Sequence, residues 1–106
     1  MIVCLIEFGV REGQLETRNE LVAQLMKAVV EVDGFISKET FISKDRLEKL
    51  VTVSYWRDGE SLDRWMNEVA HKRAIALGRR QILSYFKTQI LTVDRNVEWT
   101  APEGRA

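Results

Sequence analysis

The amino-acid sequence predicts an α+β domain in which four antiparallel strands form one sheet and two helices cover one of its faces. The first observation behind this fold class is the hydrophobic pattern, which changes from a strand period to a helix period twice along the chain. The second is the charged connection Lys44-Asp45-Arg46, which has the length expected of a hairpin loop. The resulting order is strand, helix, strand, strand, helix, strand, which is the ferredoxin-like or split βαβ arrangement.

The first strand is expected over residues 2–8, where apolar side chains occupy both alternating sets of positions. Such a strand needs cover on both faces, because a strand with one face in water would alternate with polar residues. A helix is expected over residues 14–32, because apolar residues recur there at helical spacing. Gly34 ends this helix, since glycine readily takes the left-handed conformation that helix ends often need.

The second and third strands are expected over residues 35–43 and 47–56, and the second is more polar, as an edge strand or a strand end should be. The second helix follows a turn at residues 57–60 and carries Leu62, Trp65, Met66 and Val69 on one stripe. It continues to Gly78, with or without a bend near Asn67. Residues 81–93, rich in β-formers, are the fourth strand. Residues 1–95 thus make one domain, and residues 96–106 an extended tail.

The sheet is expected to be covered on its second face by another copy of the chain. The first, third and fourth strands carry apolar residues on both faces, whereas the two helices cover only one. At roughly 25 cal/mol per Å² of apolar surface, several hundred Å² left in water would forgo around ten kcal/mol. A symmetric homodimer packed sheet against sheet, a dimeric α/β barrel, solves this problem.

Composition excludes several function classes. The 106 residues include 16 basic and 16 acidic side chains, so bulk charge does not favour nucleic acid or an anionic membrane as a partner. The single cysteine, Cys4, excludes an intramolecular disulfide and a cysteine-rich zinc site. The apolar opening meets Glu7 too soon for a signal-peptide core, and no apolar stretch is long enough for a membrane span. A cytoplasmic location is expected.

Standard catalytic motifs are absent from the sequence. It contains no GxGxxG, P-loop, G-x-S-x-G or H-E-x-x-H pattern. His71 is the only histidine, so one chain cannot build a histidine metal triad, and no metal site is expected. What remains is a cluster of aromatic and basic residues on and around the second helix.

This cluster resembles the antibiotic biosynthesis monooxygenase (ABM) family. The match consists of residues in the second strand, the third strand, the second helix and the fourth strand, namely Gly34-Phe35, Ser54-Tyr55-Trp56, Trp65, His71, Arg73-Ala74, Gly78-Arg79 and Tyr85. The resemblance spans residues 1 to about 93. It implies a small dimeric α/β barrel. The family includes cofactor-independent oxygenases that oxidise electron-rich polycyclic aromatics, and relatives that bind and break down heme.

The resemblance implies that Trp65 borders a cavity between helices and sheet, where an indole can stack on a flat substrate. The function expected is a monooxygenase that oxidises a hydrophobic aromatic small molecule without a cofactor. The protein's share would be to exclude water, position the substrate and help its deprotonated form meet oxygen. The alternatives are a heme-binding or heme-degrading protein, and a non-catalytic dimeric domain that binds a small molecule or has a closed cavity.

The candidate catalytic residues are Trp65, His71 and Glu7. Trp65 and His71 also have structural interpretations. Trp65 lies at helical spacing with Leu62 and Val69, as a core residue would, and the alternative for His71 is a partly exposed polar residue. Glu7, charged in an otherwise apolar strand, either pairs with an arginine or faces a cavity.

The candidate substrate-binding residues are Tyr55, Trp56, Arg73 and Tyr85. The alternative for the two tyrosines is packing within the barrel. The alternative for Arg73 is a solvated position near a helix C-terminus, where a positive charge interacts favourably with the helix dipole.

Two departures from the family pattern bear on the function. Active members usually carry an asparagine near the pocket, commonly on the first strand, but the polar group available there is Glu7. Heme-degrading relatives take an axial histidine about ten residues beyond the tryptophan, and here that position is Ile75. His71 lies six residues beyond Trp65, which on a straight helix places the two about 120° apart. Ligation of heme through a histidine is therefore not expected.

Overall fold

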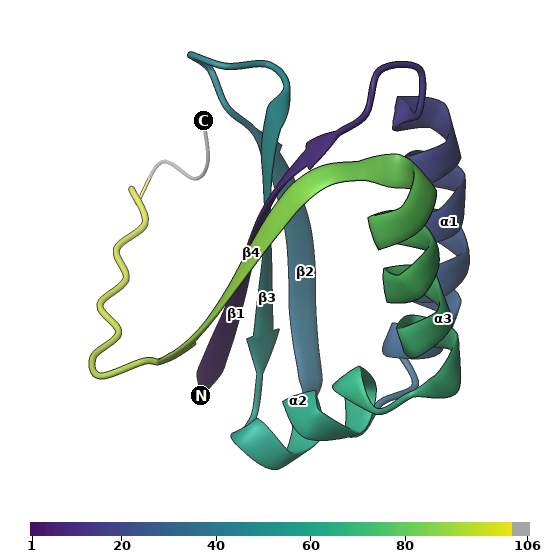
Figure 1. The fold of residues 1–106 in the computed structure, drawn as a ribbon. Helices are drawn as coiled ribbons and strands as arrows, with labels where there is room; N and C mark the ends of the chain where they lie inside the picture. Colours follow the sequence, from purple (N-terminus) through teal and green to yellow (C-terminus); the bar gives the residue numbers. More distant parts are fainter. Residues whose placement is uncertain (103–106) are drawn as a thin grey trace.

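The computed structural model describes residues 1–102, apart from the side chains of residues 69 and 70. The chain forms four strands and three α-helices, with a short π-helix before the last strand: β1 Ile2–Val10, α1 Leu15–Val29, β2 Phe35–Ile42, β3 Lys49–Trp56, α2 Gly59–Met66, α3 Val69–Leu77, η1 Gly78–Ile82 and β4 Leu83–Thr92. The strands pair antiparallel in the order β2-β3-β1-β4. All helices lie on one side of the sheet (Figure 1). The predicted ferredoxin-like fold class is confirmed.

The strand register decides which side chains face the helices. Cys4 of β1 lies opposite Ser54 of β3, and Lys38 of β2 lies opposite the same serine from the other side. Because side chains alternate along a strand, the even-numbered positions of β1 face the helices and the odd-numbered positions face away. The second face is therefore lined by residues such as Leu5 of β1 and its partner Val53.

The second predicted helix is divided into α2 and α3 at Asn67 and Glu68. The side-chain amide of Asn67 donates a hydrogen bond to the Asp63 carbonyl at 2.9 Å, and the Glu68 amide bonds to the Trp65 carbonyl at 3.0 Å. These bonds satisfy carbonyl groups that the end of α2 leaves without a helical partner. The bend that the sequence left open at Asn67 is present, and it changes the direction of the helix.

The fourth strand begins later than predicted, at Leu83 instead of residue 81, because η1 continues the helical segment. Arg11 stabilises this turn. Its guanidinium donates hydrogen bonds to the carbonyls of Arg79, Arg80 and Leu83 at 2.9–3.0 Å. Arg11, in the connection between β1 and α1, thus satisfies carbonyl groups at the C-terminal end of the helical segment. No local sequence pattern indicates this contact.

The turn between α1 and β2 requires glycine, but Gly34 lies in this turn and does not end the helix as predicted, because α1 already ends at Val29. Gly34 has φ +96°, and a Cβ there would collide with the Ser61 side chain. Ser61 is fully buried, and its amide and hydroxyl both donate hydrogen bonds to the Asp58 carboxylate that caps α2. The Gly34 carbonyl accepts a hydrogen bond from the Arg57 amide at 2.8 Å. The turn therefore packs directly against the start of α2.

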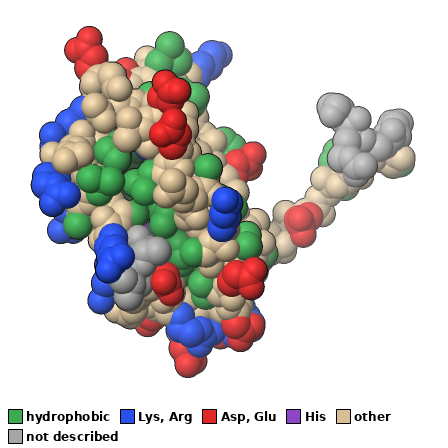
Figure 2. Space-filling view, turned by 90° about the vertical axis from the view of Figure 1, so that its right-hand side faces the viewer, with side chains coloured by type: hydrophobic (Ala, Val, Ile, Leu, Met, Phe, Trp, Pro, Cys, Tyr) green, Lys and Arg blue, Asp and Glu red, His purple; other side chains and the backbone are tan. Residues whose placement is uncertain are grey.

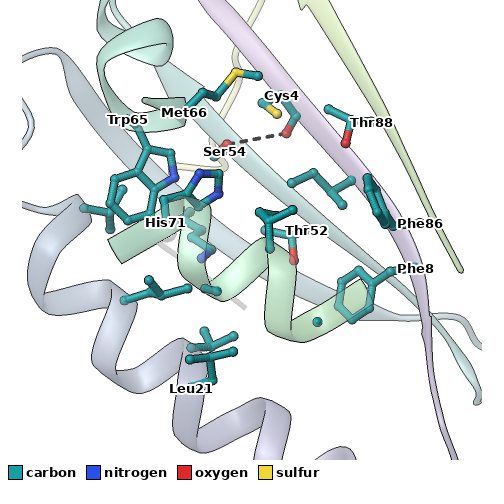
Figure 3. Close-up of a pocket in the computed structure, with 18 of the residues that line it drawn as sticks. Cys4, Phe8, Leu21, Thr52, Ser54, Trp65, Met66, His71, Phe86 and Thr88 are labelled. Atoms are coloured by element: carbon teal, nitrogen blue, oxygen red, sulfur yellow. Dashed lines mark hydrogen bonds between the residues drawn. The ribbon is translucent and has the colours of Figure 1, made fainter. Parts of the chain in front are cut away.

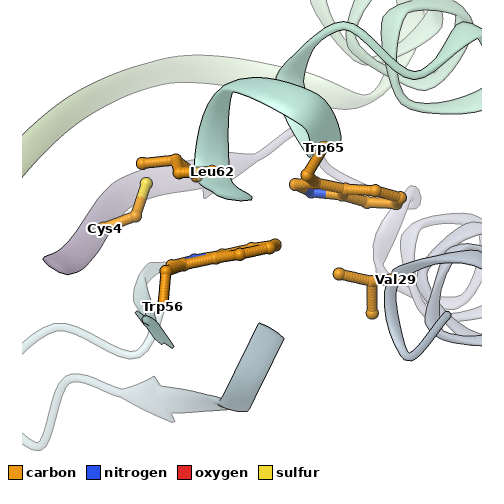
Figure 4. Close-up of a cluster of buried hydrophobic side chains, with 5 residues drawn as sticks. All are labelled: Cys4, Val29, Trp56, Leu62 and Trp65. Atoms are coloured by element: carbon orange, nitrogen blue, oxygen red, sulfur yellow. The ribbon is translucent and has the colours of Figure 1, made fainter. Parts of the chain in front are cut away.

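The hydrophobic core lies where α2 and α1 meet the sheet (Figure 4). Its buried residues are Cys4, Val29, Trp56, Leu62 and Trp65. Trp56 is 1% exposed, and its indole nitrogen donates to the Ser54 hydroxyl at 2.9 Å, so its one polar atom is satisfied. The core thus holds α2 against the sheet and gives Trp65 a defined position.

Residues 93–102 follow β4 without helix or strand and project away from the body of the protein (Figure 2). Trp99 in this segment is 82% exposed. Residues 103–106 of the predicted tail lie outside the described residues. Within the described chain, no helix has the length and apolar character that crossing a membrane would need.

Candidate functional site

A cavity of about 410 Å³ lies between the sheet and the helices. Its walls come from β1, β2, β3, β4, all three α-helices and η1, and most of the lining side chains are apolar. Figure 3 shows Trp65 and His71 at one end, Phe8 and Phe86 at the other, and Thr52 and Ser54 of β3 between them. A cavity of this size and composition suits a small organic molecule.

The aromatic end of the cavity is built by the break between α2 and α3. The rings of Trp65 and His71 have centroids 4.7 Å apart, with their planes tilted by 36°. On one straight helix these residues would lie about 120° apart and would not touch. The change of direction at Asn67 brings the imidazole round to the indole, and both side chains line the cavity.

His71 is held in its neutral form. Burial lowers the pKa of the imidazole, and the positive charge of Lys38 lowers it further, while a hydrogen bond with the Met66 backbone opposes the shift. The Nδ1 atom of His71 is buried and has no hydrogen-bond partner within the described part of the chain. The ring is therefore an uncharged base at neutral pH, and no donor among the described residues occupies the Nδ1 lone pair.

A row of hydroxyl groups crosses the helix-facing side of the sheet. The hydroxyls of Thr40 and Thr52 lie 2.9 Å apart in a hydrogen bond, and Ser54 donates to the Cys4 carbonyl at 3.5 Å. Burial raises the pKa of the Cys4 thiol, although the Ser54 hydrogen bond and the charge of Lys38 oppose this, so the thiol stays protonated. Thr52, Ser54 and Cys4 give the floor of an apolar cavity a polar strip.

Two cationic side chains reach this strip from opposite sides. Lys38 extends from β2, and burial followed by repulsion from Arg18 lowers the pKa of its ammonium group. Arg18 extends from α1, donates to the Thr40 hydroxyl at 3.4 Å and places its guanidinium 4.9 Å from the centre of the Phe8 ring. Neither side chain forms an ion pair with any residue in the part of the chain that the structure describes.

The sequence-predicted site residues divide between two faces of the sheet. Trp65, His71 and Trp56 line the cavity. Tyr55 and Tyr85 lie on the opposite face, since they occupy strand positions alternate to those that face the helices. Arg73 is exposed on α3 and lines a second, smaller hollow beside Leu77.

Glu7 lies on the face opposite the cavity and pairs with lysines, not with an arginine. Its carboxylate is 3.4 Å from the Lys49 ammonium and 3.8 Å from that of Lys87, and it accepts a hydrogen bond from the Tyr85 hydroxyl at 3.2 Å. Desolvation acts to raise the pKa of Glu7, but the two lysines and Tyr85 together hold it below its usual value. The carboxylate is therefore ionised and separated from the cavity by the sheet.

Sequence reasoning missed the polar residues of the cavity, above all Lys38 and Arg18. Strand alternation places Lys38 on the same side as Thr40, but the polar pattern of this strand indicated only an edge. Arg18 occupies a polar position in an amphipathic helix, and nothing in the sequence distinguishes it from a solvent-exposed residue of that helix. Among residues 1–102, no group of three His, Cys, Asp or Glu side chains gathers that could bind a metal ion.

A ferredoxin-like sheet with an apolar cavity beneath its helices defines a domain that can enclose a small organic molecule. The family model for antibiotic biosynthesis monooxygenases matches residues 1–77. The chain therefore belongs to the antibiotic biosynthesis monooxygenase family, as its motifs indicated.

Solved structures share the fold, and two of them illustrate the similarity. A putative antibiotic biosynthesis monooxygenase from Deinococcus radiodurans has a TM-score of 0.84 at 9% identity and covers 95% of this chain and 100% of its own. SnoaB, a cofactor-independent oxygenase from Streptomyces nogalater, gives a TM-score of 0.76 at 16% identity and covers 91% and 95%.

A relative identified by sequence is the jasmonate monooxygenase ABM of Pyricularia oryzae. It is 27% identical over 97 residues, which are 92% of this chain and 45% of that protein. The chain thus spans about half the length of this relative.

Proposed function

We propose that the protein is an oxygenase that uses molecular oxygen to oxidise a hydrophobic aromatic small molecule, with no bound metal or organic cofactor. The observation that carries this proposal is the cavity: an apolar chamber of about 410 Å³ with the Trp65 indole and a neutral His71 imidazole side by side in its wall. Two similar proteins, a jasmonate monooxygenase and a cofactor-independent oxygenase, support the same chemistry.

The proposed roles follow from the geometry. Trp65 offers a flat apolar face, against which a planar substrate gains about 0.5–1.5 kcal/mol beyond simple burial. His71, uncharged and in contact with Trp65, is the group placed to accept a proton from a substrate stacked there. Trp56 completes the wall from β3. Glu7 is left out of the mechanism because the sheet separates it from the cavity.

The reaction needs a substrate that is a weak acid. Removal of its proton by His71 leaves an electron-rich carbanion, enolate or phenolate, which transfers electrons to oxygen and forms a carbon–oxygen bond. Loss of water from the resulting hydroperoxide then gives a ketone or quinone. With anthrone as the model, one molecule of anthrone and one of oxygen give one anthraquinone and one water. The protein's contribution is to exclude solvent and to hold the anion where oxygen can reach it.

The heme alternative fits the cavity poorly. The positive charge of Lys38 acts on the imidazole of His71 and disfavours a metal cation beside it. Position 75, where the family spacing expects the histidine, is Ile75 in the cavity wall.

The test measures oxygen uptake with an electrode while anthrone is supplied to the purified protein. We expect uptake above the uncatalysed rate, with one oxygen consumed per anthraquinone formed. Trp65→Ala and His71→Ala should each reduce the rate, and the matched surface variant Lys44→Met should not. Binding of aromatic molecules without any oxygen uptake would instead support the non-catalytic binding domain.

A further inference from the structure

The charges lining the cavity are all of one sign. The described lining residues include four cationic side chains, Arg18, Lys38, Lys72 and Arg79, and no aspartate or glutamate. The chain as a whole carries equal numbers of acidic and basic residues, so this is a local segregation of charge. Figure 2 shows hydrophobic side chains gathered on the helical side of the molecule with Lys and Arg side chains beside them. An apolar chamber with positive walls favours a ligand that is both apolar and anionic.

Lys38 is the cation placed inside the chamber. It lies in register with Ser54, on the side of the sheet that carries Cys4. Lys38, Cys4 and His71 all line the cavity, and the positive charge of Lys38 acts on the Cys4 thiol and on the His71 imidazole. By contrast, Lys72 and Arg79 are exposed at the rim.

A partly buried ammonium group without a counter-ion is costly, because water is removed and no opposite charge replaces it. No ion pair with Lys38 is present among the described residues, and the cavity wall offers neutral acceptors only. An anionic oxygen on the ligand would supply the missing partner. It would also form a charge-assisted hydrogen bond, which is stronger than a bond between neutral groups.

We infer that the site holds its substrate as an organic anion, with the charged oxygen on the Lys38 ammonium and the aromatic body against Trp65 and His71. This inference rests on the proposed function and names the substrate class. Arg18 adds a second positive charge to the cavity wall and donates a hydrogen bond to the Thr40 hydroxyl. Lys38 thereby takes the role that the absent first-strand asparagine left open: it stabilises the deprotonated substrate that reacts with oxygen.

The experiment compares matched anionic and neutral probes by isothermal titration calorimetry at pH 7.5. One pair is 2-naphthoate and 2-naphthamide, which tests a carboxylate. The other is 2,4-dinitro-1-naphtholate and its methyl ether, which tests a phenolate. We expect the wild-type protein to bind at least one anion about tenfold more tightly than its neutral partner. Lys38→Met should remove that preference, Lys38→Arg should retain it, and Lys44→Met is the control for loss of a distant positive charge.

Thermal melts establish that each variant is folded, and Lys38→Gln replaces Lys38→Met should the latter not fold. An anion preference that persists unchanged without the Lys38 charge would overturn the inference, as would absence of binding by both anions. The readout is independent of catalysis. Anion binding lost with Lys38, together with no oxygen uptake, would refute the proposed oxygenase and leave the anion site standing.

Discussion

Replacing Trp65 by phenylalanine tests whether this residue is part of the site as well as of the core. Trp65 is 6% exposed, so almost the whole indole contributes to burial. Loss of about 50 Å² of buried aromatic surface, at roughly 25 cal/mol per Å², lowers the free energy of unfolding by about 1 kcal/mol. The void left beside the existing cavity adds to this, for a total of about 1–2 kcal/mol.

The same substitution shortens the flat surface at the end of the cavity where Trp65 contacts His71. Partial loss of an aromatic contact should weaken a planar probe such as 2-naphthoate about two- to tenfold. Urea denaturation measures the stability change, and isothermal titration calorimetry measures the affinity. Trp99→Phe is the matched control, because Trp99 is 82% exposed in the segment after β4 and should change neither quantity. Lower stability with unchanged probe affinity would show that Trp65 is a core residue alone.

Three further outcomes are expected. Size exclusion with light scattering at micromolar concentration should report twice the chain mass, since apolar residues such as Leu5 and Val53 line the face without helices, and a stable monomer would refute the barrel. Because the folded-state pKa of His71 lies below its ordinary value of 6.5, the unfolded chain binds the proton first, so stability should fall as pH drops below about 6.5. Urea midpoints between pH 5 and 8 measure this, and His71→Gln should flatten that part of the profile. Hemin should bind weakly, with a Soret band that His71→Ala barely alters; a tight one-to-one complex whose band collapses in that variant would restore the heme alternative.

Much of the fold could be predicted from the sequence because it depends on local patterns. Alternation and helical spacing of apolar residues placed four strands and two helical segments in the right order. Gly34 was predicted to be left-handed because few other residues tolerate that conformation. The family resemblance likewise followed from residues that stand at recognisable spacings, Trp65 and His71 among them.

The candidate site depended on relations that no local pattern contains. Both alternating sets of β1 are apolar, so the sequence could not decide which set faces the helices, and hence on which side Glu7, Tyr55 and Tyr85 lie. A straight helix would have kept His71 away from Trp65, and the direction of the break between α2 and α3 decided their contact.

Lys38 shows the same limit most clearly. Its sequence neighbours indicate an ordinary edge strand, and no local pattern shows that α1 and α3 pack over it to form the cavity. Whether a lysine is solvated or enclosed depends on what packs over it, and that is decided by tertiary structure. Local spacing therefore determined the elements of this protein, whereas the packing of the helices over one face of the sheet decided which charged groups lie in its cavity.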